Sequence, residues 1–160
     1  MSQISINFFK SKRGFTLLEV LFSLGILAFT ICGLLVTYTS SMVLLATAKN
    51  ANIATNAAMG LMEQIHTDTF SRIANDYDGM VFTVNGMPSI NGRPSSSGFV
   101  YVNDTNPELL NVTISICWRQ GNRVIGEDAD LDGTLNNTED VNGNGIADSP
   151  VELESLIANR

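Results

Sequence analysis

Lys10 to Val20 reads KSKRGFTLLEV, and it opens the apolar segment that decides how this chain is organised. Three basic residues and a glycine precede the apolar run, which then contains an acid, Glu19, close to its start. No Asp, Glu, Lys or Arg occurs from Val20 to Ala48, a run of 29 residues. About 20 apolar residues suffice for a helix to cross a bilayer. The run therefore predicts one membrane-spanning helix.

The flanks of the run predict its orientation. Basic residues favour the cytoplasmic side of a membrane, so Lys10, Lys12 and Arg13 predict a cytoplasmic N-terminus and an outward-facing remainder. A secretory signal would have a shorter apolar region with a small-residue cleavage site after it. This run is longer and has no such site nearby, which favours a retained anchor.

The apolar spacing of a helix continues beyond the charge-free run. One helix is predicted from about Thr16 to Ile73, apolar on all sides in its first half and amphipathic in its second. Strands are predicted at Met80–Val84, Phe99–Val102, Val112–Trp118 and Arg123–Ile125. Strict alternation in the third of these predicts a strand buried on one face. The expected fold class is α+β, with the long helix packed on three or four antiparallel strands.

Composition excludes several kinds of function. The 16 acidic and nine basic residues give a net charge of -7, which argues against a nucleic-acid partner. Cys32 and Cys117 are expected to be free, and His66 has no second histidine nearby. The sequence contains no nucleophile–base pair, phosphate loop or Cys/His cluster. We therefore expect no enzymatic activity and no catalytic residue.

The KRG sequence followed by FTLLEVLFSLGIL resembles the prepilin signal of type IV pilins and type II secretion pseudopilins. The resemblance implies that a prepilin peptidase cuts between Gly14 and Phe15 and that Phe15 becomes an N-methylated terminus. It also implies assembly with other pilin subunits by inner-membrane machinery. The chain would be a single-pass inner-membrane protein with a periplasmic C-terminal domain, and would then enter a surface pilus or a periplasmic pseudopilus.

Two further stretches, MEQIHTDTFSRIANDYDG and NVTISICWRQGNR, are loosely similar to minor pilins. They favour a minor pilin of a type IV pilus, with a type II secretion pseudopilin as the alternative. Adhesion, motility and DNA uptake all stay open. The expected segments are a leader at 1–14, a transmembrane and filament-core helix at 15–45, a pilin-like periplasmic domain at 46–126, and an acidic tail at 127–160.

Glu19 requires a specific explanation, because a carboxylate within a membrane helix is costly without a partner. In a filament, the partner implied by the resemblance is the terminal amine that cleavage creates at Phe15 of a neighbouring subunit. This pairing would set the axial register of the subunits. The alternative is an interfacial glutamate that stabilises the helix N-terminus, where the helix dipole favours negative charge.

Residues 128–139 read DADLDGTLNNTE and match the calcium-loop pattern D-x-[DN]-x-[DN]-G-x5-E. Calcium binds six to eight oxygens, which alternate residues of such a loop supply. The expected ligands are Asp128, Asp130, Asp132, the carbonyl of Thr134, Asn136 and both oxygens of Glu139. Because a strand precedes the loop, the tail is more similar to dockerin and thrombospondin type 3 repeats than to a paired EF-hand.

A second, degenerate loop follows at once, with Asp140, Asn142, Asn144, Ile146 and Asp148 as its expected ligands. Its twelfth position is Val151, so this site is expected to be weaker or to be completed by a neighbour. The tail is then expected to end in a short helix, with Ser149 and Glu152 as a capping box. Two alternatives stay open: a solvated acidic linker without calcium, and a membrane-anchored calcium-binding module that forms no filament.

Overall fold

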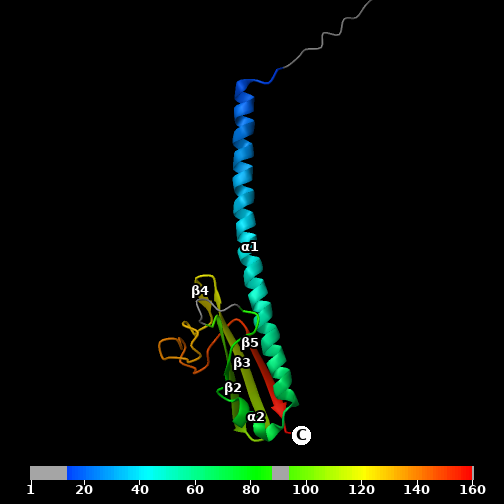
Figure 1. Cartoon of the computed structure of the whole chain (residues 1–160), viewed down its shortest axis with the longest axis vertical. Coiled ribbons are helices and arrows are strands. Elements are labelled where there is room, and N and C mark those ends of the chain that lie inside the picture. The colour runs from blue at the N-terminus through cyan, green and yellow to red at the C-terminus, as the bar shows by residue number, and fades with distance from the viewer. Residues whose placement is uncertain (1–13, 88–93, 160) are drawn as a thin grey trace, which may run out of the picture. The chain divides into compact units, whose positions relative to one another are not determined.

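The computed structural model describes residues 14–87 and 94–159 (Figure 1). The basic flank at Lys10, Lys12 and Arg13 lies outside the described residues. The chain divides into two compact units, Met1–Val43 and Leu44–Arg160. Helix α1, Leu17–Thr67, begins in the first unit and ends in the second.

The first unit contains the apolar half of α1. Its large apolar side chains are exposed, and α1 is long and apolar enough to cross a membrane. Hydroxyl groups in this half bond to the carbonyl one turn earlier, as Ser23 does to Glu19 and Thr30 to Ile26. These bonds satisfy the polar groups of the helix internally, as a lipid environment requires.

In the second unit, α1 buries one narrow stripe, made of Ala54, Ala58, Met62 and Ile65. The helix ends at Thr67, and a separate helix α2 covers Phe70–Tyr77. The prediction of one helix as far as Ile73 is therefore wrong. Asp68 accounts for the break, because its side chain accepts a hydrogen bond from the backbone N–H of Thr69. Such local bonds compete with helical hydrogen bonding.

Within the part of the chain that the structure describes, the sheet of the second unit is antiparallel and has five strands: β1 Val81–Phe82, β2 Ser96–Asn106, β3 Leu109–Gln120, β4 Arg123–Ile125 and β5 Glu152–Ala158. β1 pairs with β2, and β2 pairs with β3. β4 and β5 share the other edge of β3, β4 at Trp118–Gln120 and β5 at Leu109–Ser115. The predicted α+β class, with a helix on a small antiparallel sheet, is confirmed.

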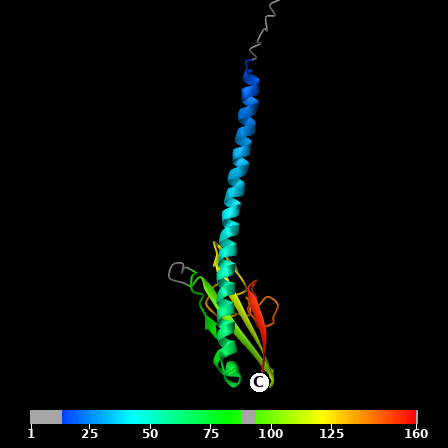
Figure 2. The same cartoon turned by 90° about the vertical axis from the view of Figure 1, so that its right-hand side faces the viewer.

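The prediction of a short C-terminal helix is wrong, because that segment is strand β5 (Figures 1 and 2). Leu153, Ser155 and Ile157 are half-buried, whereas Glu154 and Leu156 are exposed. This alternation has the two-residue period of a strand. Ser149 does not cap a helix: its hydroxyl donates to the carbonyl of Ile116 in β3. The open edge of β3 thus supplies the backbone partners that the local sequence could not reveal.

The sheet is covered on both faces, so the prediction that β3 is buried on one face only is wrong. Its Ile114, Ile116 and Trp118 side chains join the α1 stripe in one core. Phe99 and Cys117 form a second core with two residues of the segment between β4 and β5, Leu131 and Ala147. The two cysteines are free, as predicted. The acidic segment is therefore a third layer of the second unit rather than a free tail.

Candidate functional site

The first acidic loop folds around the carboxyl group of Asp128. This side chain is fully buried. One of its oxygens accepts the backbone N–H of Leu131 at 2.8 Å, and the other accepts that of Gly133 at 3.1 Å. Leu131 and Gly133 both have positive φ, 61° and 84°. The chain therefore turns sharply around the first residue of the predicted calcium pattern.

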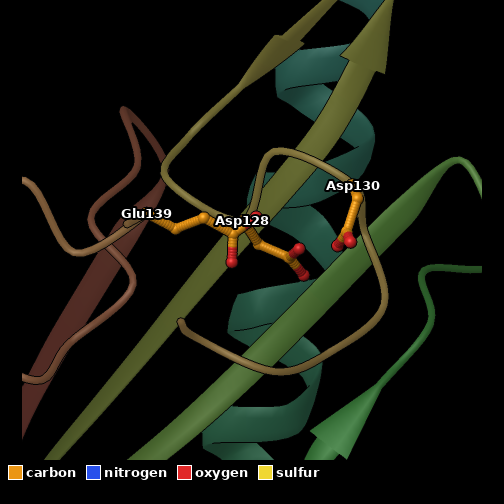
Figure 3. A group of neighbouring side chains, drawn as sticks. All are labelled: Asp128, Asp130 and Glu139. Atoms are coloured by element: carbon orange, nitrogen blue, oxygen red, sulfur yellow. The ribbon is translucent and has the colours of Figure 1, made fainter. Parts of the chain in front are cut away.

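Three of the predicted ligands come together. Carboxylate oxygens of Asp128, Asp130 and Glu139 all lie within 4.8 Å of one another, and Figure 3 shows the three side chains converging within the loop. Asp132 lies outside this group, with its Oδ1 accepting the backbone N–H of Thr134 at 2.7 Å. Asn136 reaches the cluster through its amide, which donates to Glu139 at 3.1 Å. The carboxylates of Asp128, Asp130 and Glu139 therefore face one another at the centre of the loop.

The electrostatic state of Asp128 reflects its burial. Loss of water raises the pKa of this carboxyl group above its usual value, and the nearby Glu139 charge raises it further. The Ser97 hydroxyl and the N–H groups of Gly133 and Leu131 counteract this rise. The Ser97 oxygen is buried beside the carboxyl group but does not meet the geometry of a hydrogen bond with any described residue.

The second loop repeats the backbone pattern of the first, twelve residues later. Asp140 accepts the N–H groups of Gly143 and Gly145 at 2.7 and 2.9 Å, as Asp128 accepts those of residues 131 and 133. Asn144 accepts the N–H of Ile146 at 2.7 Å, as Asp132 accepts that of Thr134. Both carboxylate oxygens of Asp148 accept amide groups, from Asn142 and Asn144. Among the described residues, the acids of this loop do not form a cluster as tight as that of the first.

Sequence reasoning missed Glu127, whose carboxylate is hydrogen-bonded to the backbone of the second loop. Its two oxygens accept the N–H groups of Val141 at 3.3 Å and Asp148 at 3.1 Å. A signal was present in the sequence, since Glu-Asp opens both EDADLDG and EDVNGNG. This repeat places Glu127 before the first loop and Glu139 before the second.

The N-terminal segment forms the start of α1. The Thr16 hydroxyl accepts the backbone N–H of Glu19 at 3.3 Å, which makes Thr16 the N-cap of the helix. Glu19 lies exposed in the first turn, and Phe15 is 82% exposed just before it. Within the described residues, the Glu19 carboxylate has no hydrogen-bond or ion-pair partner. This geometry fits both roles considered for Glu19: stabilisation of the helix N-terminus, and pairing with a positive group of another molecule.

Residues 9–35 match the prokaryotic N-terminal methylation motif. The match supports a type IV pilin-like family and fits the precursors of pilins or pseudopilins, which are structural proteins rather than enzymes. No curated protein and no solved structure matches the chain. The motif spans Gly14, Phe15 and Glu19, so it implies processing by a prepilin peptidase and assembly with other pilins. It ends before the acidic loops, whose role depends on their own geometry.

Proposed function

We propose that this chain is a minor pilin of a type IV pilus, cut after Gly14, methylated at Phe15 and assembled through its N-terminal helix. The observation that carries the proposal is the match of residues 9–35 to the methylation motif, together with the apolar span that follows. The exposed apolar side chains of the first half of α1 would pack against neighbouring helices in the filament. Before assembly, the same side chains would face lipid.

Glu19 sets the register of assembly in this proposal. Its carboxylate lies in the first turn of α1 without a partner among the described residues. A free terminal amine at Phe15 of an adjacent subunit supplies the opposite charge. Transferring an acid into an apolar filament core is costly unless such a partner is present, so only axial positions that pair the two groups are favourable.

The acidic loops bind calcium in this proposal. The side chains of Asp128, Asp130 and Glu139 converge, and the glycine in the sixth position of the loop has the positive φ that the sharp turn needs. Asp132, Asn136 and the carbonyl of Thr134 would complete the first site. In the second loop, Asp140, Asn142, Asn144, the carbonyl of Ile146 and Asp148 are the corresponding donors. Calcium would neutralise the mutual repulsion of these acids, including the buried Asp128 carboxylate.

The proposed location of the loops outside the cytoplasm is compatible with a calcium role. Extracellular calcium sites have dissociation constants of about 10⁻⁴ to 10⁻³ M, which millimolar calcium outside the cell would fill. The loops lie between β4 and β5 and cover one face of the sheet. An ion bound there would therefore stabilise a surface layer of the periplasmic domain.

Mass spectrometry of the N-terminal peptide tests the filament proposal. Sheared surface filaments and the membrane pellet are analysed separately, with a Gly14→Ala variant as the control for cleavage. A methylated Phe15 terminus in the sheared fraction, absent from Gly14→Ala, supports a pilus subunit. A processed terminus found only in the pellet favours a pseudopilin. An intact Met1 or Ser2 terminus in every fraction rejects both and favours an anchored module.

Calcium titration calorimetry of the full chain in detergent micelles tests the ion. Heat of binding is expected for the wild type and for Asp104→Asn, an exposed acid of β2 outside the loops. Asp130→Asn removes one convergent carboxylate and should weaken binding at the first loop by tenfold or more. The absence of calcium heat from the wild type would reject the calcium part of the proposal and leave the filament part standing.

A further inference from the structure

We infer that the two acidic loops form one coupled pair of calcium sites, in which Glu127 closes the second loop as Glu139 closes the first. The inference rests on the calcium binding proposed above and adds both a ligand and a regulatory property. It makes the second site complete rather than degenerate. It also predicts that binding of one ion favours binding of the other.

Glu127 and Glu139 occupy equivalent places. Glu139 accepts the N–H groups of the second and ninth residues of its loop, Ala129 at 3.0 Å and Asn136 at 3.2 Å. Glu127 accepts those of the second and ninth residues of the other loop, Val141 at 3.3 Å and Asp148 at 3.1 Å. Each glutamate thus spans its loop between the same two positions. The twelfth-position role that Val151 cannot fill is filled by a residue from before the first loop.

The coupling arises from the chain connectivity of these ligands. Glu127 is adjacent to Asp128, the first ligand of the first loop, and Glu139 is adjacent to Asp140, the first ligand of the second. Two Glu-Asp pairs therefore each contribute one carboxylate to each loop. The backbone fixes this arrangement further, since the N–H of Glu127 donates to the carbonyl of Asp148 at 2.9 Å.

A second, independent feature points to a ligand at this place. The Ser97 side chain of β2 is 2% exposed, and its hydroxyl has no hydrogen-bond partner among the described residues. It lies under the first loop, with its oxygen 3.7 Å from where a Cβ on Gly133 would stand. A buried hydroxyl beside the Asp128 carboxyl group is the polar lining that an ion site needs and that a solvated acidic linker does not.

The loops are also held as a unit on the sheet. The N–H of Ala147 donates to the Tyr101 hydroxyl at 2.9 Å, and the Ser115 hydroxyl donates to the carbonyl of Ala147. Leu131 of the first loop and Ala147 of the second lie in the same small core. Ordering either loop therefore orders both Glu-Asp pairs. The second ion meets ligands whose conformational entropy has already been lost, which gives positive cooperativity without any further change of structure.

Calcium titration of the full chain in detergent micelles measures both the number of ions and their coupling. Two ions with a Hill coefficient above 1 are expected for the wild type. Glu127→Gln should abolish the second site and weaken the first by about 5- to 150-fold, the usual range of coupling between sites. Glu108→Gln, an exposed glutamate in the β2–β3 turn, is the matched control and should bind as the wild type does.

Asp140→Asn provides the reciprocal measurement, because it damages the second loop and leaves Glu127 in place. It should weaken the first site by a factor similar to that of Glu127→Gln, and circular dichroism in chelator should match the wild type for both variants. Two independent ions, or one ion unaffected by Glu127→Gln, would overturn the inference and leave calcium binding intact. No binding by the wild type would instead reject the calcium proposal itself.

Discussion

The Ser115 hydroxyl of β3 donates a hydrogen bond to the backbone carbonyl of Ala147 in the second acidic loop. Ser115 is also the last residue of β3 to pair with β5, opposite Glu152. The loop is therefore attached where β5 begins, and β4 pairs with the same edge of β3 a few residues further on. Ser115 therefore contacts both the second acidic loop and the first residue of β5, so the order of the loop and the pairing of β5 are linked.

If the loops bind calcium as proposed, removal of the ion is expected to loosen β5. Without the ion, repulsion among Asp128, Asp130 and Glu139 opposes the compact loop. The acidic loops connect β4 to β5, and β5 pairs with β3 from Glu152 onward. Loosening of the loops should therefore release the start of β5. Hydrogen exchange of the full chain in micelles, in calcium and in chelator, should show faster exchange of Glu152–Ala158 after calcium removal.

Helix α2 is the internal reference for this measurement. Phe70–Tyr77 contacts β2, and its buried residues Ile73 and Tyr77 lie in the α1 core, whereas Leu131 and Ala147 of the loops lie in the other core. The exchange of α2 should be the same in both solutions. Equal protection of β5 with and without calcium would show that the strand is held by β3 and α1 alone.

Gly133→Ala is expected to destabilise the first loop more than Gly145→Ala destabilises the second. Both glycines are the sixth residue of their loop and both have positive φ, 84° and 76°, so alanine costs about 1–2 kcal/mol at either place. Only at Gly133 would the new Cβ meet another side chain, at 2.7 Å from Val81. Thermal unfolding in excess calcium should therefore rank the two variants in this order.

Val81→Ala separates the cost of the positive φ at residue 133 from the cost of the contact between the new Cβ and Val81. In that background the overlap at residue 133 is relieved, and Gly133→Ala should cost about as much as Gly145→Ala. If Gly133→Ala stays the more damaging in the Val81→Ala background, then the contact with β1 does not explain the difference. A loss of bound calcium would then be the next quantity to compare between the variants.

Much of the fold could be predicted from local pattern. The charge-free run predicts the apolar half of α1, and the alternation at Val112–Trp118 predicts β3. The strand β5 could not be predicted in this way, because Ser149, Pro150 and Glu152 match a helix start locally. The pairing partner that decides the matter is β3, more than 30 residues earlier in the chain. Tertiary hydrogen bonding overrode a capping signal.

The acidic site, too, was predictable from the sequence only where its residues lie close together in the chain. Asp128 and the pattern that follows it are recognisable from spacing, because the loop ligands are close in sequence. Glu127 lies outside the twelve-residue pattern of the loop that it closes, so a search in linear order assigns the second loop no closing acid. The burial of Asp128 against Ser97 also depends on the sheet, and spacing within the loop carries no information about it.

Tyr77 predicts a pH dependence of stability. Its hydroxyl donates to Asp68 at 3.2 Å, and its pKa is raised above the usual 10.0, first by burial and then by Asp68. The folded state therefore holds this proton more tightly than the unfolded state. The stabilisation is complete below about pH 10 and is lost as the pH rises through the raised pKa.

Tyr77→Phe tests this dependence in urea unfolding between pH 8 and pH 11. At pH 8 the variant should be less stable by about 0.5–1.5 kcal/mol, the usual net value of one hydrogen bond. The gap between the two proteins should narrow above pH 10. Tyr101, whose pKa is also raised, is present in both and cancels in the comparison. A gap that stays constant to pH 11 would show that the pKa of Tyr77 is the same in the folded and unfolded states.

Glu19→Gln is expected to stop assembly and to leave insertion and cleavage unchanged. The substitution keeps the length of the side chain, and the Thr16 hydroxyl still accepts the backbone N–H of residue 19. Only the charge that would pair with the Phe15 amine of a neighbour is removed. Mass spectrometry should find the processed variant in the membrane and little of it in sheared filaments.

Thr16→Val is the matched variant for the helix-capping role of this turn. It removes the cap of α1, at a cost of about 0.5–2 kcal/mol, and it keeps the Glu19 charge. If pairing with a neighbour is the function of Glu19, Thr16→Val assembles and Glu19→Gln does not, provided that both are cleaved after Gly14. Equal loss of assembly in the two variants would instead assign Glu19 to the stability of the helix start, because both changes act on the same first turn.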